Sequence, residues 1–154
     1  MSNDSERALK LFIVLTRASK VILEEAHKPI DKYALNPTEF AVLELLFHKG
    51  RLPIQKIGQK ILLRSGSMTY VVDKLEERGF LERVSCEKDK RVTYMSITSM
   101  GIELIDSIFP EHAKNIESIM SVLTPKEQDL MIELVKKLGL SVKNLSLNEH
   151  RIYN

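Results

Sequence analysis

The sequence predicts a mainly α-helical fold with one small β-hairpin. Apolar residues recur at three- and four-residue steps through most of the chain, which is the period of an amphipathic helix. Capping signals stand at several expected helix starts, and one pair of neighbouring segments is β-prone. Six glycines and five prolines are also few for an all-β fold, which needs many turns.

The first two helices are expected over residues 5–33 and from residue 36 onward. The first is predicted because its apolar residues keep the helical period along one face. The second begins at Asn36, which can cap it, while Pro37 suits the first helical position and Glu39 can reach back to the cap amide. It should end near Gly50.

Two shorter helices follow in the middle of the chain. One is opened by Pro53 and carries Ile54, Ile57 and Ile61 on one side. The Arg-Ser-Gly-Ser run at 64–67 interrupts the pattern and offers Ser65 as the next N-cap. The following helix should end at Gly79, which suits a left-handed C-terminal position.

The second half of the chain predicts a hairpin and two more helices. Residues 80–86 and 92–97 are β-prone and flank the charged turn 87–91. Thr98 or Ser99 can cap a long fifth helix, in which Pro110 predicts a kink or a break. Thr-Pro-Lys-Glu at 124–127 is a capping box for a last helix that should stop before Gly139. The tail from Ser141 is weakly patterned and is expected to be loose.

Charge is unevenly distributed along the chain. The net charge is +2, but residues 51–94 hold ten Lys/Arg against six Asp/Glu, or +4, which leaves −2 for the rest. A basic middle between mildly acidic ends suits a nucleic-acid reader held by a scaffold. A solvated helical face is the alternative explanation for the same excess.

The composition also favours a cytoplasmic protein. The single cysteine, Cys86, cannot form an intrachain disulfide, which fits a reducing compartment. No apolar run approaches the roughly 20 residues that span a bilayer, so no membrane partner is expected.

The fourth helix has the character of a helix that enters the major groove. Met68, Val72 and Leu75 cluster on one side of a helical wheel, and small or hydroxyl-bearing residues and a lysine lie on or beside the other. Small residues allow close approach, hydroxyls can bond to bases, and a cation can contact phosphate. A plain surface helix is the alternative.

The charged turn has the position of a wing beside that helix. Lys88, Lys90 and Arg91 would lie at its tip, where Arg91 can enter a narrow A·T-rich minor groove. Asp89 should not face DNA, so we expect it to orient Arg91 or to bond a nearby backbone amide. A solvated charged turn is again the alternative.

These motifs together resemble the MarR family of multiple-antibiotic-resistance-type regulators. The resemblance is carried by Asn-Pro-Thr-Glu-Phe-Ala-Val-Leu at 36–43, the helix 54–62, Ser-Gly-Ser-Met-Thr at 65–69, Val-Asp-Lys-Leu-Glu-Glu-Arg-Gly-Phe-Leu at 72–81, Asp-Lys-Arg at 89–91, and Ile-Thr at 97–98 leading into Gly101. The long flanking helices are similar to the family's dimerisation arms. Within the family the chain looks most like the branch of stress-response repressors that respond to quinones and catechols.

The resemblance implies a winged helix-turn-helix in residues 36–98. A dimerisation helix in 1–35 and dimerisation helices in 99–145 would flank it, with a loose tail in 146–154. It implies a homodimeric repressor on a pseudo-palindromic operator, with Ser65, Ser67 and Thr69 near bases, Arg91 in the minor groove and an effector pocket between the lobes. We expect the DNA contacts to come from Arg64, Ser65, Gly66, Ser67, Thr69, Tyr70, Lys74, Lys88, Asp89, Lys90 and Arg91.

Physical reasoning also favours a dimer. The apolar stripes of the first, fifth and sixth helices are too extensive to face water, and one small lobe covers only part of them. Pairing across a two-fold axis would bury the rest and set two recognition helices about one DNA turn, ~34 Å, apart.

The identity of the effector is the part of the function that the sequence indicates least. Aromatic and polar residues that can line a pocket for a flat phenolic or quinone ligand are Phe12, Thr16, Phe40, Phe47, His48, Phe109 and His112. Cys86 can be an oxidant-sensitive thiol favoured by Arg83 and Lys88, or a small hydrophobic strand residue, which is the commoner role. The peroxide-sensing branch of the family uses a cysteine in the first long helix, and this chain has none there.

Other functional classes find little support. The four histidines lack metal-ligand spacing, no phosphate-binding loop is present, and no nucleophile–base pair stands out. We therefore expect no metal, no cofactor and no enzyme activity. The remaining alternative is a winged-helix module that binds protein instead of DNA.

Overall fold

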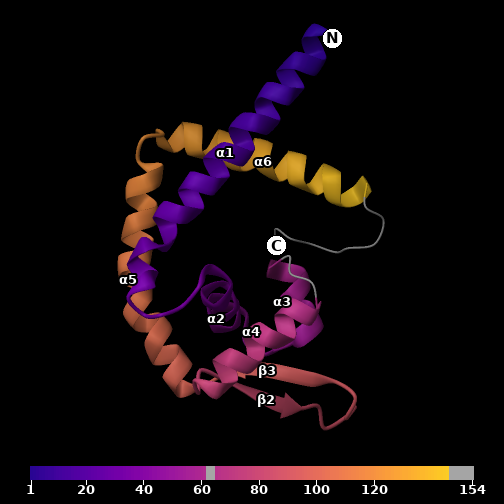
Figure 1. The fold of residues 1–154 in the computed structure, drawn as a ribbon, viewed down its shortest axis with the longest axis vertical. Helices are drawn as coiled ribbons and strands as arrows, with labels where there is room; N and C mark the ends of the chain where they lie inside the picture. The colour runs from indigo at the N-terminus through magenta and orange to yellow at the C-terminus, as the bar shows by residue number, and fades with distance from the viewer. Residues whose placement is uncertain (62–64, 146–154) are drawn as a thin grey trace.

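Long helices at the two ends of the chain enclose a smaller lobe built from its basic middle (Figure 1). The computed structural model describes residues 1–61 and 65–145. Within them the elements are α1 (Asn3–Asp31), α2 (Pro37–Lys49), β1 (Leu52–Pro53), α3 (Ile54–Ile61), α4 (Ser65–Glu77), β2 (Leu81–Ser85), β3 (Thr93–Ile97), α5 (Ser99–Met120) and α6 (Pro125–Leu145). The predicted fold class, mainly helical with a small β wing, is confirmed.

The helix starts follow the predicted capping residues. Asn36 Oδ1 accepts from the Glu39 amide at 2.8 Å, and Glu39 Oε2 accepts from the Asn36 amide at 3.0 Å, so the capping box of α2 is complete. Thr98 caps α5 through its hydroxyl. The second box is also present, because the Thr124 amide donates to Glu127 Oε2 at 2.8 Å and the Glu127 amide to Thr124 Oγ1 at 3.3 Å.

The sheet has three antiparallel strands in the order β1-β3-β2. The predicted hairpin pairs Leu81 with Ile97 at one end and Ser85 with Thr93 at the other. The sequence analysis missed β1, which pairs Leu52 with Met95 along the other side of β3. Two residues are too short to show an alternating pattern.

Three helix boundaries differ from the sequence prediction. α5 continues through Pro110, so the helix does not break there. α6 continues past Gly139 to Leu145, and Ser65 lies within α4 instead of before it. Ile105 and Ile108 are fully buried, so packing holds the turns of α5 before the proline. One interior glycine costs only about 1 kcal/mol relative to alanine and does not by itself end a helix. The expected loose tail at 146–154 lies outside the described residues.

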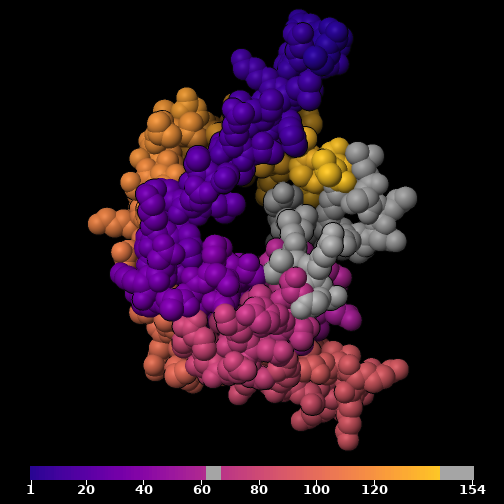
Figure 2. All heavy atoms as spheres, viewed as in Figure 1, coloured from indigo at the N-terminus to yellow at the C-terminus, as the bar shows by residue number. Residues whose placement is uncertain are grey.

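The core lies where α2, α3, α4, β3 and α5 meet. Its fully buried side chains come from all five elements: Leu43, Leu46, Ile57, Met68, Leu75, Met95 and Ile105. By contrast, almost every described side chain of α6 is exposed. The N-terminal half of α1 projects from the body of the molecule (Figure 2). In the described part of the chain, no helix combines the length and apolar character needed to cross a membrane.

Candidate DNA-binding surface

The predicted recognition helix, α4, turns a polar face outward. Its apolar positions Met68, Val72 and Leu75 have no exposed surface, so the helix is fixed to the core along one side. Predicted contact residues remain exposed on its other side: Ser67, Thr69, Tyr70 and Lys74. Ser65 and Gly66 belong to its first turn, and Arg64 lies outside the described residues.

Glu39 is a buried carboxylate behind this helix. The sequence predicted only a capping role for it. Glu39 is 3% exposed, and its carboxylate lies 3.7 Å from Lys74 Nζ and 3.8 Å from Arg78 Nη1. Lys74 Nζ also lies 5.5 Å from the centre of the Tyr70 ring. The Lys74 ammonium is therefore held against the surface of α4 by Glu39 and Tyr70. It is also exposed, so it can contact a phosphate.

Arg78, at the end of α4, ties the helix to the turn between α1 and α2. Its Nη1 donates to the Ala34 carbonyl at 2.7 Å, and its Nη2 donates to the Tyr33 carbonyl at 3.1 Å. Ala34 has a positive φ of 53°, which turns the chain sharply. Beside it, His27 Nε2 donates to the Leu35 carbonyl at 2.8 Å. The turn is therefore held from α4 on one side and from α1 on the other.

The wing tip carries an exposed and oriented arginine. Asp89 accepts from the Arg91 backbone amide at 3.1 Å and from Arg91 Nε and Nη2 at 3.0 and 3.1 Å. Both expected roles of Asp89, pairing with Arg91 and with a nearby amide, are therefore present. The side-chain hydrogen bond from Arg91, followed by its backbone amide, lowers the pKa of Asp89, and the same pair raises the pKa of Arg91. The Arg91 side chain is 91% exposed, and Lys88 and Lys90 beside it are exposed as well.

A second arginine joins the wing to the recognition helix. Arg83 on β2 forms hydrogen-bonded ion pairs with Asp73 and Glu76 of α4. The hydrogen bond to Asp73 is the main cause that raises the pKa of Arg83. Asp73 lies on or beside the outer side of a helical wheel of this segment, and a wheel cannot show that a strand will supply a partner for it. This bridge fixes the wing relative to α4.

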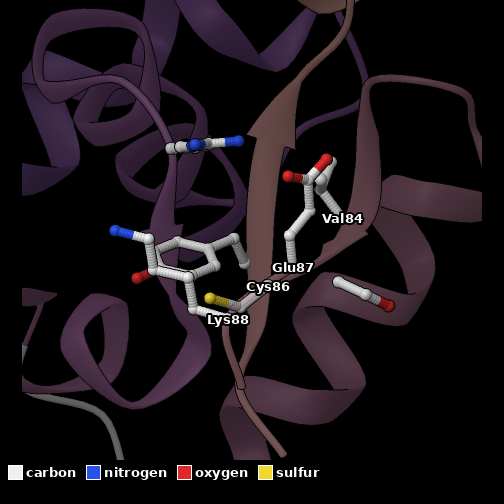
Figure 3. Close-up of a pocket in the computed structure, with 7 residues that line it drawn as sticks. Val84, Cys86, Glu87 and Lys88 are labelled. Atoms are coloured by element: carbon white, nitrogen blue, oxygen red, sulfur yellow. The ribbon is translucent and has the colours of Figure 1, made fainter. Parts of the chain in front are cut away.

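Cys86 lies in a shallow cavity on the wing sheet (Figure 3). The cavity is about 420 Å³ and is also lined by Arg51, Tyr94 and Lys88; the Arg51 guanidinium stands 5.5 Å from the centre of the Tyr94 ring. The Cys86 amide donates to the Val92 carbonyl at 3.1 Å. Lys88 lines the same cavity as Cys86, whereas Arg83 is engaged by the α4 carboxylates.

The predicted pocket residues fall into three groups. Phe40 and His112 line a cavity of about 630 Å³ between α1, α2 and α5, with ring centroids 4.9 Å apart. Phe47, His48 and Phe109 extend the same aromatic cluster beside it, with the His48 ring 5.2 Å from Phe47 and 5.5 Å from Phe109. Phe12 and Thr16 do not line this cavity and lie on the exposed part of α1.

Most of the cavity lining was missed by the sequence analysis. Additional lining residues are Leu23, Glu24, Ala26, His27, Ile30, Asp31, Pro37, Ala41, Glu44 and Ile116. His27 could have been suspected, because a histidine on a half-buried helix face needs a polar partner. Among the described residues, no three His, Cys, Asp or Glu side chains are grouped as metal ligands would be.

The chain is similar to known transcriptional regulators. The model of the MarR family matches residues 35–93, which contain α2, α3, α4 and most of the wing. The HTH-type transcriptional regulator MhqR of Bacillus subtilis is 53% identical over 139 residues, covering 90% of this chain and 96% of that protein. The uncharacterized HTH-type transcriptional regulator YkoM of the same organism is 46% identical over 140 residues, covering 91% of each.

Solved structures share the fold at lower identity. Bordetella bronchiseptica BpsR, whose DNA binding is regulated by 6-hydroxynicotinic acid, matches with a TM-score of 0.74 and 21% identity over 82% of this chain and 90% of that chain. Reduced AbfR bound to DNA matches with a TM-score of 0.73 and 22% identity over 94% and 99%.

Proposed function

The chain belongs to the MarR family of DNA-binding transcriptional regulators, and from that premise we propose that it is a homodimeric repressor released from its operator by a small phenolic or quinone effector. The family and its relatives are regulators and not enzymes. The proposal concerns the operator contacts, the dimer and the effector.

The observation that carries the proposal is the pairing of α4 with a braced wing. α4 exposes hydroxyl groups and Lys74, and Arg83 fixes the wing relative to this helix. Asp89 holds Arg91 while leaving it 91% exposed. A helix in the major groove and an arginine in the adjacent minor groove require this arrangement. AbfR, with the same fold, has been solved bound to DNA.

The exposed apolar surface supports the homodimer. α1 exposes about half or more of Leu9, Leu11 and Phe12, and α6 does the same with Leu130, Ile132 and Leu134; both helices lie at the same end of the molecule (Figure 1). A monomer rarely leaves so many large apolar side chains in water. Pairing through this end would leave both α4 helices free for successive turns of DNA.

The cavity between α1, α2 and α5 supports the effector. Its volume of about 630 Å³ suits a small aromatic ligand. His27 lines the cavity and holds the turn through Leu35, while Arg78 holds the same turn from the end of α4. A ligand that displaces α1 would therefore act on the recognition helix through these bonds. BpsR, which shares the fold, has its DNA binding regulated by 6-hydroxynicotinic acid, and this supports control of DNA binding by a small aromatic molecule.

The DNA-binding proposal is tested by fluorescence anisotropy with duplex from the gene's own upstream region. We expect dimer-stoichiometric binding that weakens with salt, with a log–log slope of about −0.9 for each phosphate contacted. Arg91→Ala should weaken binding on the order of tenfold and relax the preference for A·T flanks.

Arg7→Ala is the matched control. Arg7 is also exposed and paired with a nearby aspartate, Asp4, but it lies on α1 far along the chain from the wing. Equal loss in both variants would contradict the wing assignment. A protein that prefers no duplex sequence even at low salt would instead favour a protein-interaction module.

The effector is tested by adding catechol or 1,4-benzoquinone to the protein–DNA complex. Release by catechol under reducing conditions would show reversible binding, because catechol then has no electrophilic carbon. Cys86→Ser should keep both DNA binding and release. Loss of release in that variant alone would instead assign sensing to the thiol.

A further inference from the structure

The cavity between α1, α2 and α5 is acidic, and this has a consequence for the effector it can hold. Three carboxylates line it, from Glu24 and Asp31 of α1 and Glu44 of α2, and no lysine or arginine does. In the described part of the chain, Glu24 and Glu44 have no ion pair. The Asp31 carboxylate lies 3.4 Å from the imidazole Nε2 of His27 and has no lysine or arginine partner among the described residues. The cavity therefore has a negative potential.

Nearby cations do not offset this charge. Lys28 pairs with Glu25, and Lys32, in the turn after α1, pairs with Glu111 of α5. Each of these lysines is engaged by a carboxylate outside the cavity lining. A ligand carboxylate would thus enter near three like charges, of which Glu44 is half-buried and least screened by solvent.

One buried polar atom of the cavity wall lacks a partner. His112 Nδ1 is inaccessible to solvent and makes no hydrogen bond within the described chain. The ring packs edge-on against Phe40 at 4.9 Å, and the apolar residues Ile30 and Ile116 complete the lining around it. Because solvent cannot reach Nδ1, this nitrogen does not face the open cavity, and this part of the wall offers a phenol ring an aromatic and apolar surface.

We infer that the cavity selects phenols by charge: it binds uncharged or cationic phenols and rejects those that carry a carboxylate. The inference rests on the proposed function for treating this cavity as the effector site. It adds the charge of the effector, which neither the family nor the fold determines. It also distinguishes this chain from a regulator that recognises an aromatic acid.

Three phenols that differ only at the end of a two-carbon arm test the inference. Tyrosol is neutral, tyramine is cationic and 3-(4-hydroxyphenyl)propionate is anionic at pH 7.5. Calorimetric titration of the full chain without DNA should show the propionate binding at least about tenfold more weakly than tyrosol, because like charges repel at short range in a partly buried site. Tyramine should bind at least as tightly as tyrosol.

Variants of the lining identify the source of the selectivity. Glu44→Gln should reduce the ratio of the dissociation constants of propionate and tyrosol by about threefold or more, because it removes the least screened charge. Glu103→Gln makes the same charge change on α5 outside the cavity and should leave the difference unchanged.

Equal affinity for the three phenols, tightest binding of the propionate, or no binding of any would overturn the inference. Its failure is distinct from failure of the proposed function, which is measured on DNA. Charge-selective binding that leaves the operator complex intact would keep the inference and contradict the effector part of the proposal. If the propionate, and neither of the other two phenols, released the operator complex, the effector part of the proposal would be kept and the inference contradicted.

Discussion

Replacement of Arg78 by methionine tests how α4 is anchored to the long helix. Arg78→Met keeps the length of the side chain but removes the donors to the Tyr33 and Ala34 carbonyls, at 3.1 and 2.7 Å. It also removes the guanidinium that stands 5.0 Å from the centre of the Phe80 ring. Bonds to a charged donor contribute about 1.5–3 kcal/mol each when protected from water. Because Arg78 is one-third exposed, about 1 kcal/mol for each bond is appropriate.

With about 0.5 kcal/mol for the exposed cation–π contact, the free energy of unfolding should fall by about 2–3 kcal/mol. For a chain of this size each kcal/mol lowers Tm by about 2–4 °C, so Tm should fall by about 4–12 °C at fixed protein concentration. Calorimetry or circular dichroism would measure it. Arg78→Lys should give a smaller decrease, since one ammonium cannot reach both carbonyls in the same geometry. Arg91→Met, at the exposed wing tip, is the control and should lower Tm much less, because an ion pair this exposed contributes little to stability. An Arg78→Met variant as stable as this control would refute the anchoring role.

Three further predictions follow from single contacts. Arg83→Met should free the wing from α4 and weaken operator binding about three- to tenfold by anisotropy, and unchanged affinity would show that the wing is positioned by other contacts. Ala34→Gly should raise Tm by a few degrees, because glycine adopts a φ of 53° without the cost of about 1 kcal/mol that a side chain incurs; a lower Tm would contradict strain at this turn. The pKa of Asp89, followed by carboxyl NMR, should lie below its ordinary value and rise in Arg91→Ala. Since this pKa is lowered on folding, the pair stabilises the wing above the ordinary pKa and is lost as pH falls through the lowered one; an unshifted value would exclude the pair.

The lobe could be predicted from sequence because its signals are local. The capping box at Asn36 and the cap at Thr98 each involve residues three apart, and the buried positions of α4 follow one helical stripe. Such patterns are readable before any tertiary contact is known. The pairing of Asp89 with Arg91 was accessible for the same reason, since the two residues are only two positions apart in the sequence.

Contacts between distant segments were not accessible in this way. Glu39 was expected only as part of a cap, yet it also lies against Lys74 and Arg78 of another helix. β1 depends on pairing across more than forty residues, from Leu52 to Met95, and a two-residue strand leaves no periodic signal. These features depend on how the elements pack, so one sequence without an alignment contains no direct sign of them.

The predicted pocket residues that do not line this cavity show why helical period alone cannot define a site. Phe12 and His27 both lie on α1, but they are 15 positions apart, which corresponds to about 22 Å along the helix axis at 1.5 Å per residue. That length exceeds the span of a single phenol, so a ligand that contacts His27 cannot also contact Phe12 of the same chain. Period places side chains on a face without limiting their separation along it. The cavity is instead defined where α2 and α5 cross α1 near Ile30 and Phe40. This crossing also brings Glu24 and Glu44 to one wall, so the charge that we expect to select the effector is a product of the packing and not of any local motif.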